Sequence, residues 1–190
     1  MLSIGITGGI GSGKSLVCSL IENMGYPVFY SDLEAKKNML HNLDLISQIT
    51  KSFGKESYVE GKINTTYLSS LIFSDPNAKE QLNKLVHPSV YQSFDLWKEK
   101  QHSAFVFNES ALLIETGSFH RFDKIVLVSA PTNLKIRRIM KRDTCSKEEA
   151  IKKMKAQWSD EQNRKHCFFE IINDEKSALL PQIWKLITSL

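Results

Sequence analysis

The first residues whose types and spacing could do chemistry form a glycine-rich loop near the start of the chain. The segment from Gly8 to Ser15 reads G-x-x-x-x-G-K-S. Glycines let backbone N–H groups approach an anion closely, a lysine reaches the β- and γ-phosphates, and a serine hydroxyl suits Mg²⁺. A strand-like run precedes the loop and a helical run follows it, so the helix N-terminus adds its dipole. The segment predicts a site for a nucleoside triphosphate.

Two carboxylates are placed to act beside that loop. Asp32 ends the strand-like run YPVFYSD, and Glu109 ends a later one, SAFVFNE. Ligands of open α/β sheets bind beyond the carboxyl ends of the strands, where Asp32 could take a proton from an attacking hydroxyl and Glu109 could hold Mg²⁺ through water. The plain alternatives are that Asp32 caps a helix starting at Leu33 and that Glu109 is a solvated strand-end residue. The residues alone leave both questions open.

The segment from Lys135 to Lys155 holds a local excess of basic residues. Charged helical segments are usually solvated faces. Arg138 and Arg142, however, lie four residues apart on one helix face, where two cations repel unless they meet an anion. This spacing favours a triphosphate-facing role for at least one of them, and Arg164 is a further candidate.

The rest of the chain alternates strand-like and helical runs. Strand character is confined to five apolar runs, LSIGIT, YPVFYSD, SAFVFNE, DKIVLVSA and CFFEIIND. The helical runs between them include one from Leu33 to about Phe53. This order predicts an α/β fold in three layers, a parallel sheet covered by helices, as the core of a phosphate-loop (P-loop) nucleoside-triphosphate-binding protein.

The middle of the chain has no convincing strand. Its helical runs are punctuated by Pro76 and Pro88, with Asp75 placed to cap the helix that Pro76 begins. This region is either a helical excursion at the sheet edge or a substrate-gripping subdomain. We expect a single domain with a core at about 1–57, 102–135 and 166–190, a helical substrate-binding insert at about 58–101 and a helical lid at about 136–165.

The composition limits the other function classes. The chain has 190 residues, 42% hydrophobic and 24% charged, and a net charge of +4, as in a globular domain. Aromatic residues are not interleaved with a basic run, so no nucleic-acid partner is expected. Three cysteines without C-x-x-C spacing argue against a disulfide framework or a zinc site, and no apolar run reaches membrane-spanning length. We expect a cytoplasmic protein without a membrane partner, as a monomer or weak homo-oligomer.

Phosphate loops serve switches, motors and kinases alike. The chain has no D-x-x-G or N-K-x-D segment of a guanine-nucleotide switch, and it is short for a motor ATPase. Phosphoryl transfer to a small acceptor is therefore favoured. A kinase for another small molecule or nucleoside and a non-enzymatic nucleotide-binding module remain alternatives.

Taken in order along the chain, several motifs resemble those of the dephospho-coenzyme A (dephospho-CoA) kinase family. IGITGGIGSGKS resembles that family's opening, and GYPVFYSD its second strand with a catalytic Asp. The segments LNKLVHPSV, ESALLIETG, RRIMKRD, KMKAQWSDEQNRKH and FEIIND follow in the family's order. The match covers nearly the whole chain. It implies an ATP-dependent kinase that phosphorylates the ribose 3′-hydroxyl of dephospho-CoA, giving coenzyme A and ADP in the final step of coenzyme A biosynthesis.

The chain departs from the family's pattern at three places. Tyr30-Ser31-Asp32 stands where many relatives have D-A-D, which leaves the acid that the family uses as its base. Ala111 replaces a proline, which should loosen a turn. Glu109 stands where Asp is common, and its metal role is less secure for that reason.

The resemblance also implies a set of site residues. Asp32 would be the catalytic base, and Lys14 and Arg142 would stabilise the transferring phosphoryl group. Arg138 and Arg164 would join as lid contacts to the phosphates. Magnesium would accompany the co-substrate ATP and lie on Ser15. ATP would lie on Gly9, Ile10, Gly11, Ser12, Gly13, Lys14, Ser15 and Leu16, and dephospho-CoA on Thr7, Asp32, His87, Leu113 and Glu115. For His87, a buried helix-cap histidine before Pro88 is the alternative.

Overall fold

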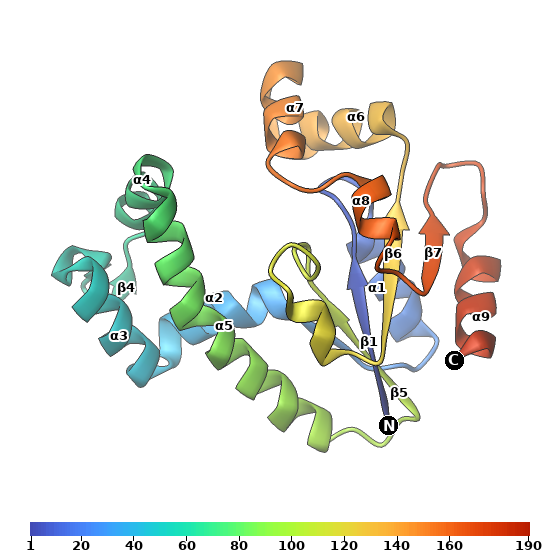
Figure 1. Cartoon of the computed structure of the whole chain (residues 1–190), viewed down its shortest axis with the longest axis horizontal. Helices are drawn as coiled ribbons and strands as arrows, with labels where there is room; N and C mark the ends of the chain where they lie inside the picture. Colours follow the sequence, from blue (N-terminus) through green and yellow to red (C-terminus); the bar gives the residue numbers. More distant parts are fainter. The chain divides into compact units, whose positions relative to one another are not determined.

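A computed structural model describes all residues from 1 to 190, except for the side chain of Pro76. The chain divides into two compact units (Figure 1). Unit 1 comprises Met1–Tyr30 and Gln101–Leu190, and unit 2 comprises Ser31–Lys100. The boundary near residue 31 differs from the one expected at 58, because the first two helices of the second unit pack with its long helix.

Unit 1 is built on a five-stranded sheet in which every pair of neighbouring strands is parallel. The strand order is β2-β5-β1-β6-β7, so β1 is central. The five predicted strands and the predicted α/β class are confirmed. The strands are β1 (Leu2–Thr7), β2 (Val28–Tyr30), β5 (Phe105–Glu109), β6 (Lys124–Ser129) and β7 (Phe169–Ile172).

Helices and turns cover both faces of this sheet. On one face, α1 and α9 pack together over a cluster that includes Ile4, Phe107 and Val126. On the other face, Leu113 and Ile125 belong to a smaller apolar cluster. These are the expected three layers. The helices of unit 1 are α1 (Lys14–Asn23), the 3₁₀ turn η2 (Ser118–Arg121), α6 (Thr132–Asp143), α7 (Lys147–Lys155), α8 (Asp160–Arg164) and α9 (Leu179–Ser189).

Unit 2 is mainly helical, as expected, but three details differ from the sequence-based expectation. Its elements are α2 (Ser31–His41), α3 (Leu43–Phe53), the 3₁₀ turn η1 (Lys55–Ser57), β3 (Tyr58–Val59), β4 (Lys62–Ile63), α4 (Thr65–Ser74) and α5 (Pro76–Glu99). The single helix expected over 33–53 is two helices, because the Asn42 side chain accepts a hydrogen bond from the Leu45 N–H and starts α3 afresh. A short antiparallel hairpin, β3–β4, occupies a region where no strand was expected.

The third difference is that the long helix α5 runs through Pro88, which was expected to interrupt it. Proline removes one intrahelical hydrogen bond and usually bends or ends a helix. Here Val86, Val90 and Phe94 are buried on both sides of the proline, so packing outweighs the local loss. The expected cap is confirmed, since Asp75 accepts a hydrogen bond from the Asn77 N–H at 2.8 Å. Within the described part of the chain, no helix combines the length and the apolarity that a membrane span needs.

Candidate active site

The phosphate loop joins β1 to α1 in a conformation that suits an anion. Gly11 and Gly13 have φ angles of 79° and 95°, and Gly13 directly precedes the first turn of α1. Among the described residues, no side chain caps that turn, which leaves the positive end of the helix dipole available to an anion. Lys14 is buried, and its Nζ donates a hydrogen bond to the Gly8 carbonyl at 2.7 Å. The predicted cradle is therefore formed, with its lysine folded back over the loop.

Close contacts explain why the loop needs glycine at two of its positions. A Cβ atom at Gly8 would lie 2.2 Å from the Val128 carbonyl oxygen of the neighbouring strand β6, and one at Gly13 would lie 2.0 Å from Asn173 Nδ2. Both residues also have positive φ. The loop thus passes against β6 and against the end of β7 with no room for a side chain.

Replacing Gly8 with Ala is expected to lower the free energy of unfolding by about 2 kcal/mol or more, because the new methyl group overlaps a backbone oxygen and the residue has φ of 150°. Urea unfolding monitored by circular dichroism measures the change. Gly25→Ala is the matched control, since Gly25 also has positive φ but no atom within 4 Å of the place that the new methyl group would take. Equal losses in the two variants would show that only backbone strain is involved.

Arg138, one of the predicted lid contacts, donates hydrogen bonds to carbonyl groups of the phosphate loop. Its Nη1 donates to the carbonyls of Gly11 and Ser12, both at 3.3 Å, and its Nη2 donates to the Asn173 carbonyl at 3.1 Å. Asn173 Nδ2 adds a bond to the Ser12 carbonyl at 2.8 Å. In this arrangement Arg138 ties the loop to the end of β7. Asn173 was missed by the sequence analysis, although its place directly after the last strand marks it as a candidate.

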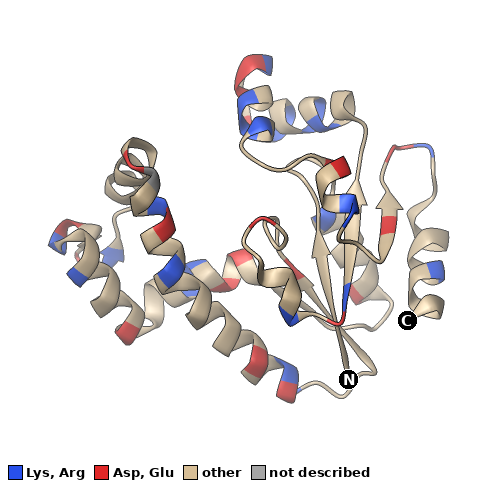
Figure 2. Ribbon diagram, viewed as in Figure 1, with Lys and Arg blue, Asp and Glu red and all other residues tan. Residues whose placement is uncertain are grey.

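The other two predicted lid arginines are paired with carboxylates on the surface of unit 1. Arg142 Nε donates to Asp143 Oδ1 at 2.7 Å, and Arg164 Nε donates to Glu170 Oε2 at 2.7 Å. Hydrogen bonds from Arg142 and Lys153 hold the pKa of Asp143 well below its usual range. Figure 2 shows Lys and Arg spread along α6 and α7, so these two helices of the predicted lid are basic. The structure does not bring Arg142 or Arg164 to the phosphate loop.

The predicted base Asp32 is the second residue of α2 and belongs to unit 2. The helix begins at Ser31 rather than at Leu33, so Asp32 lies inside the first turn instead of capping it. Its side chain is exposed. Only Ser31 separates Asp32 from Tyr30, the last residue of β2.

The second candidate carboxylate, Glu109, is buried at the carboxyl end of β5, with 7% of its surface exposed. Its neighbours in the sheet are Ile6 of β1 and Tyr30 of β2. The alternative of a solvated strand-end glutamate is therefore wrong. Burial, with the charge of Glu109 as the next contribution, raises the pKa of the Cys18 thiol, which makes that cysteine an inert core residue. Glu109 thus lies at the ligand-binding edge of the sheet.

Three of the residues predicted to contact the acceptor lie in unit 1. Thr7 is fully buried, and its hydroxyl donates to the Ala111 carbonyl at 3.4 Å. The Leu113 side chain packs in the apolar cluster with Ile125, so a ligand could reach only its backbone. Glu115 Oε1 accepts a hydrogen bond from the Trp158 N–H at 3.1 Å. Its other carboxylate oxygen is buried and has no hydrogen-bond partner among the described residues.

The fourth predicted acceptor contact, His87, lies in the interior of α5 in unit 2. It is half-buried, its ring lies 6.0 Å from that of Tyr91, and burial lowers the pKa of its imidazole. The alternative of a helix cap is wrong, because α5 continues for eleven residues after Pro88, to Glu99. His87 therefore lies within the helix rather than at its end.

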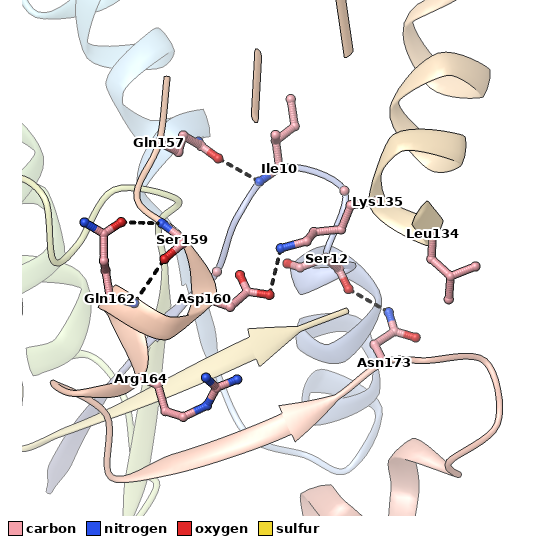
Figure 3. A network of polar contacts seen from close by, with 12 residues as sticks. Ile10, Ser12, Leu134, Lys135, Gln157, Ser159, Asp160, Gln162, Arg164 and Asn173 are labelled. Atoms are coloured by element: carbon pink, nitrogen blue, oxygen red, sulfur yellow. Dashed lines mark hydrogen bonds and ion pairs between the residues drawn. The ribbon is translucent and has the colours of Figure 1, made fainter. Parts of the chain in front are cut away.

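A polar network that the sequence did not reveal lies over the phosphate loop (Figure 3). Gln157 Oε1 accepts a hydrogen bond from the Ile10 N–H at 2.7 Å, and Lys135 Nζ pairs with Asp160 Oδ2 at 2.7 Å. These residues line a cavity of about 520 Å³ together with Gly9 and apolar residues of α6 and α7. No residue-type pattern in the lid segment distinguished Gln157 from the other polar side chains around it.

Comparisons with known proteins agree on one family. The family profile described as dephospho-CoA kinase matches residues 2–178. A dephospho-CoA kinase of Bacteroides fragilis is 39% identical over 190 residues, which is 100% of this chain and 93% of that protein. The solved structure of TT1252 from Thermus thermophilus is 32% identical with a TM-score of 0.87, covering 99% of this chain and 96% of that one. The structure of dephospho-CoA kinase from Campylobacter jejuni is 26% identical with a TM-score of 0.67, covering 98% and 96%.

Proposed function

The chain belongs to the dephospho-CoA kinase family, and we propose from its geometry how its residues carry out that reaction. The reaction is the phosphorylation of dephospho-CoA by ATP, which completes coenzyme A biosynthesis. The observation that carries the proposal is the phosphate loop, with the buried Lys14 at the uncapped start of α1. ATP binds along residues 9–16, with its phosphates against the loop and the uncapped start of α1.

Asp32 acts as the general base in this proposal. The ribose 3′-hydroxyl of dephospho-CoA gives its proton to the Asp32 carboxylate while the hydroxyl oxygen attacks the γ-phosphorus in line, and the bond to the β-phosphate oxygen breaks to release ADP. The exposed carboxylate at the start of α2 is accessible to such a hydroxyl. Its connection to the end of β2 through one residue supports a place at the ligand-binding edge of the sheet.

Lys14 and Arg142 stabilise the negative charge of the transferring group. Lys14 needs only to turn its ammonium from the Gly8 carbonyl toward the phosphates. Arg142 must leave the carboxylate of Asp143, which also pairs with Lys153. Arg164 can leave Glu170 in the same way. Arg138 supports ATP binding by donating hydrogen bonds to the loop carbonyls, and it would contact the phosphates in addition.

Magnesium fits the donor set at the loop. Mg²⁺ prefers oxygen ligands, keeps several of its waters and is commonly held by one or two side chains together with substrate phosphates. Ser15 offers an exposed hydroxyl in the first turn of α1, and Glu109 offers a carboxylate at the end of β5. Ser15 would bind the ion directly and Glu109 through water. The ion would supply positive charge that offsets the negative charge of the phosphates.

Dephospho-CoA is placed, in this proposal, against Thr7, His87, Leu113 and Glu115. Glu115 is the best supported of these, because one of its carboxylate oxygens is buried without a partner among the described residues, whereas buried polar atoms normally have one. The side chains of Thr7 and Leu113 are packed inside the protein, so the acceptor would lie against the backbone of these two residues. We further propose that the protein works in the cytoplasm, where its three free thiols stay reduced, as a monomer or weak homo-oligomer.

The acceptor and the metal are tested together with purified protein. We expect ADP release only when ATP, Mg²⁺ and dephospho-CoA are all present, with equal amounts of coenzyme A and ADP formed, and no turnover after the metal is chelated. Coupled-enzyme detection of ADP and chromatography of the coenzyme A product measure this. Parallel reactions use a nucleoside and a sugar acid as acceptors. Turnover on either of these but not on dephospho-CoA would overturn the assignment, and full activity in chelator would overturn the role of magnesium.

A further inference from the structure

The segment after α7, residues 157–160, contacts three separate parts of unit 1 through neighbouring residues (Figure 3). Gln157 contacts the phosphate loop, the Trp158 N–H donates to Glu115 beyond β5, and Asp160 pairs with Lys135 of α6. The first two contacts join positions 147 and 43 residues apart in the chain. This segment therefore connects the ATP-binding loop with the carboxylate proposed to contact the acceptor.

The Gln157 contact reaches the backbone of the loop itself. Because Ile10 N–H is a donor, the atom facing it at 2.7 Å is the amide oxygen, Oε1. The loop carries glycine at positions 8, 9, 11 and 13, so it loses much conformational freedom when it is ordered. An external hydrogen bond at Ile10 holds the part of the loop that lies between these glycines, before any nucleotide arrives.

The Lys135–Asp160 pair holds the segment that carries Gln157. Only 8% of the Lys135 side chain and 15% of the Asp160 side chain are exposed. A Cβ at Gly9 would lie 3.6 Å from Asp160 Oδ1 and 3.7 Å from Lys135 Nζ, so the pair packs directly on the loop backbone. Shielding from water strengthens the attraction between the two charges and penalises the loss of either one. The pair thus fixes the segment at Asp160, three residues after Gln157.

From these contacts we infer that Gln157 is a positioning residue for phosphoryl transfer, which holds the Ile10 N–H and keeps the phosphate loop ready for ATP. Its side chain acts through the loop backbone. Lys135 and Asp160 keep Gln157 in place, and the Trp158–Glu115 hydrogen bond links the same segment to the acceptor side. The inference rests on the proposed function only for the identity of the nucleotide that the loop receives.

The test compares Gln157→Met with Gln162→Met. Methionine has a similar length but no oxygen to accept the Ile10 N–H. Gln162 lines the same cavity, yet among the described residues its side chain is bonded to the Ser159 N–H of its own helix cap rather than to the loop. We expect Gln157→Met to weaken MgATP binding about 3- to 10-fold, the fold-change for one lost hydrogen bond. The KM for dephospho-CoA should stay the same in both variants, and Gln162→Met should keep the wild-type ATP affinity.

A second measurement needs no turnover. Amide hydrogen exchange followed by NMR should show the Ile10 N–H protected in the ligand-free wild type and in Gln162→Met, and exposed in Gln157→Met. Rapid exchange at Ile10 in the wild type would overturn the inference even if the variant fails to fold. Equal ATP affinities in the two variants, or equal rises in the constants for both substrates, would also overturn it. A failure of the proposed acceptor would leave the Ile10 exchange and ATP-binding results unaffected, so the two failures are distinguishable.

Discussion

Replacing Asp32 with Asn is expected to lower kcat by about 10²- to 10⁴-fold, the usual contribution of a general base, while MgATP still binds. Asparagine keeps the size of the side chain but cannot take the proton of the ribose hydroxyl. ATP binding should survive because the triphosphate is proposed to lie on the phosphate loop and the first turn of α1, to which Asp32 does not belong. Steady-state kinetics with saturating substrates measure kcat, and titration calorimetry measures the affinity for MgATP.

Glu34→Gln is the matched control for Asp32→Asn. Both carboxylates lie in the first turn of α2, where each interacts favourably with the helix dipole. Glu34 also contacts Lys37 at 3.5 Å on the same helix, so its loss reports the structural cost of removing a first-turn acid. Similar kcat values in the two variants would reduce Asp32 to a helix-stabilising residue. A large loss confined to Asp32→Asn would assign it the proton transfer.

The second large effect is expected from Lys14→Met, which should lower kcat/KM for ATP by about 10²- to 10³-fold, as when one preorganised charge-stabilising donor is removed. Lys14 directly follows the loop glycines, and its Nζ lies 2.7 Å from the Gly8 carbonyl. Methionine keeps the apolar stem that packs in the loop but places no charge at the phosphates. Initial rates over a range of MgATP concentrations give kcat and KM separately.

Lys185→Met provides the control for Lys14→Met. Lys185 is an exposed lysine of α9 in the same unit, so its replacement changes the net charge equally without touching the loop. It should leave the kinetics unchanged. Thermal unfolding of both variants separates a loss of charge from a loss of fold. If Lys14→Met keeps wild-type kcat/KM, the phosphate loop does not hold ATP in the way proposed here.

Local patterns determined most of the sheet and its loop. The five strands are short apolar runs that end in glycine, acid or polar residues, and buried parallel strands produce that pattern wherever they occur. The glycines of the phosphate loop and the helix after it follow from neighbours in the chain. Where a tertiary contact outweighed the local signal, expectation and structure differ. Pro88 stays inside α5 because the helix is buried on both sides of it, and Asn42 divides a helix that hydrophobic spacing alone would continue.

The partners of the long polar side chains were decided only by the tertiary structure. The sequence placed Arg138 and Arg142 on one helix face, but packing directs Arg138 to the carbonyls behind the loop and leaves Arg142 at the surface with Asp143. It placed Glu109 at a strand end, while the sheet order buries that carboxylate between β1 and β2.

The sequence by itself determined the family, the phosphate loop and the acid that follows the second strand, because each depends on residue types within a few positions of one another. The tertiary structure decided which residues hold the loop in place. Gln157 and Asn173 reach it from 147 and 161 residues away in the chain, and only the folded structure brings them beside the loop that follows β1. Hydrogen bonds between residues so far apart in the chain depend on how helices and strands pack, and the spacing of residues in the sequence does not predict that packing.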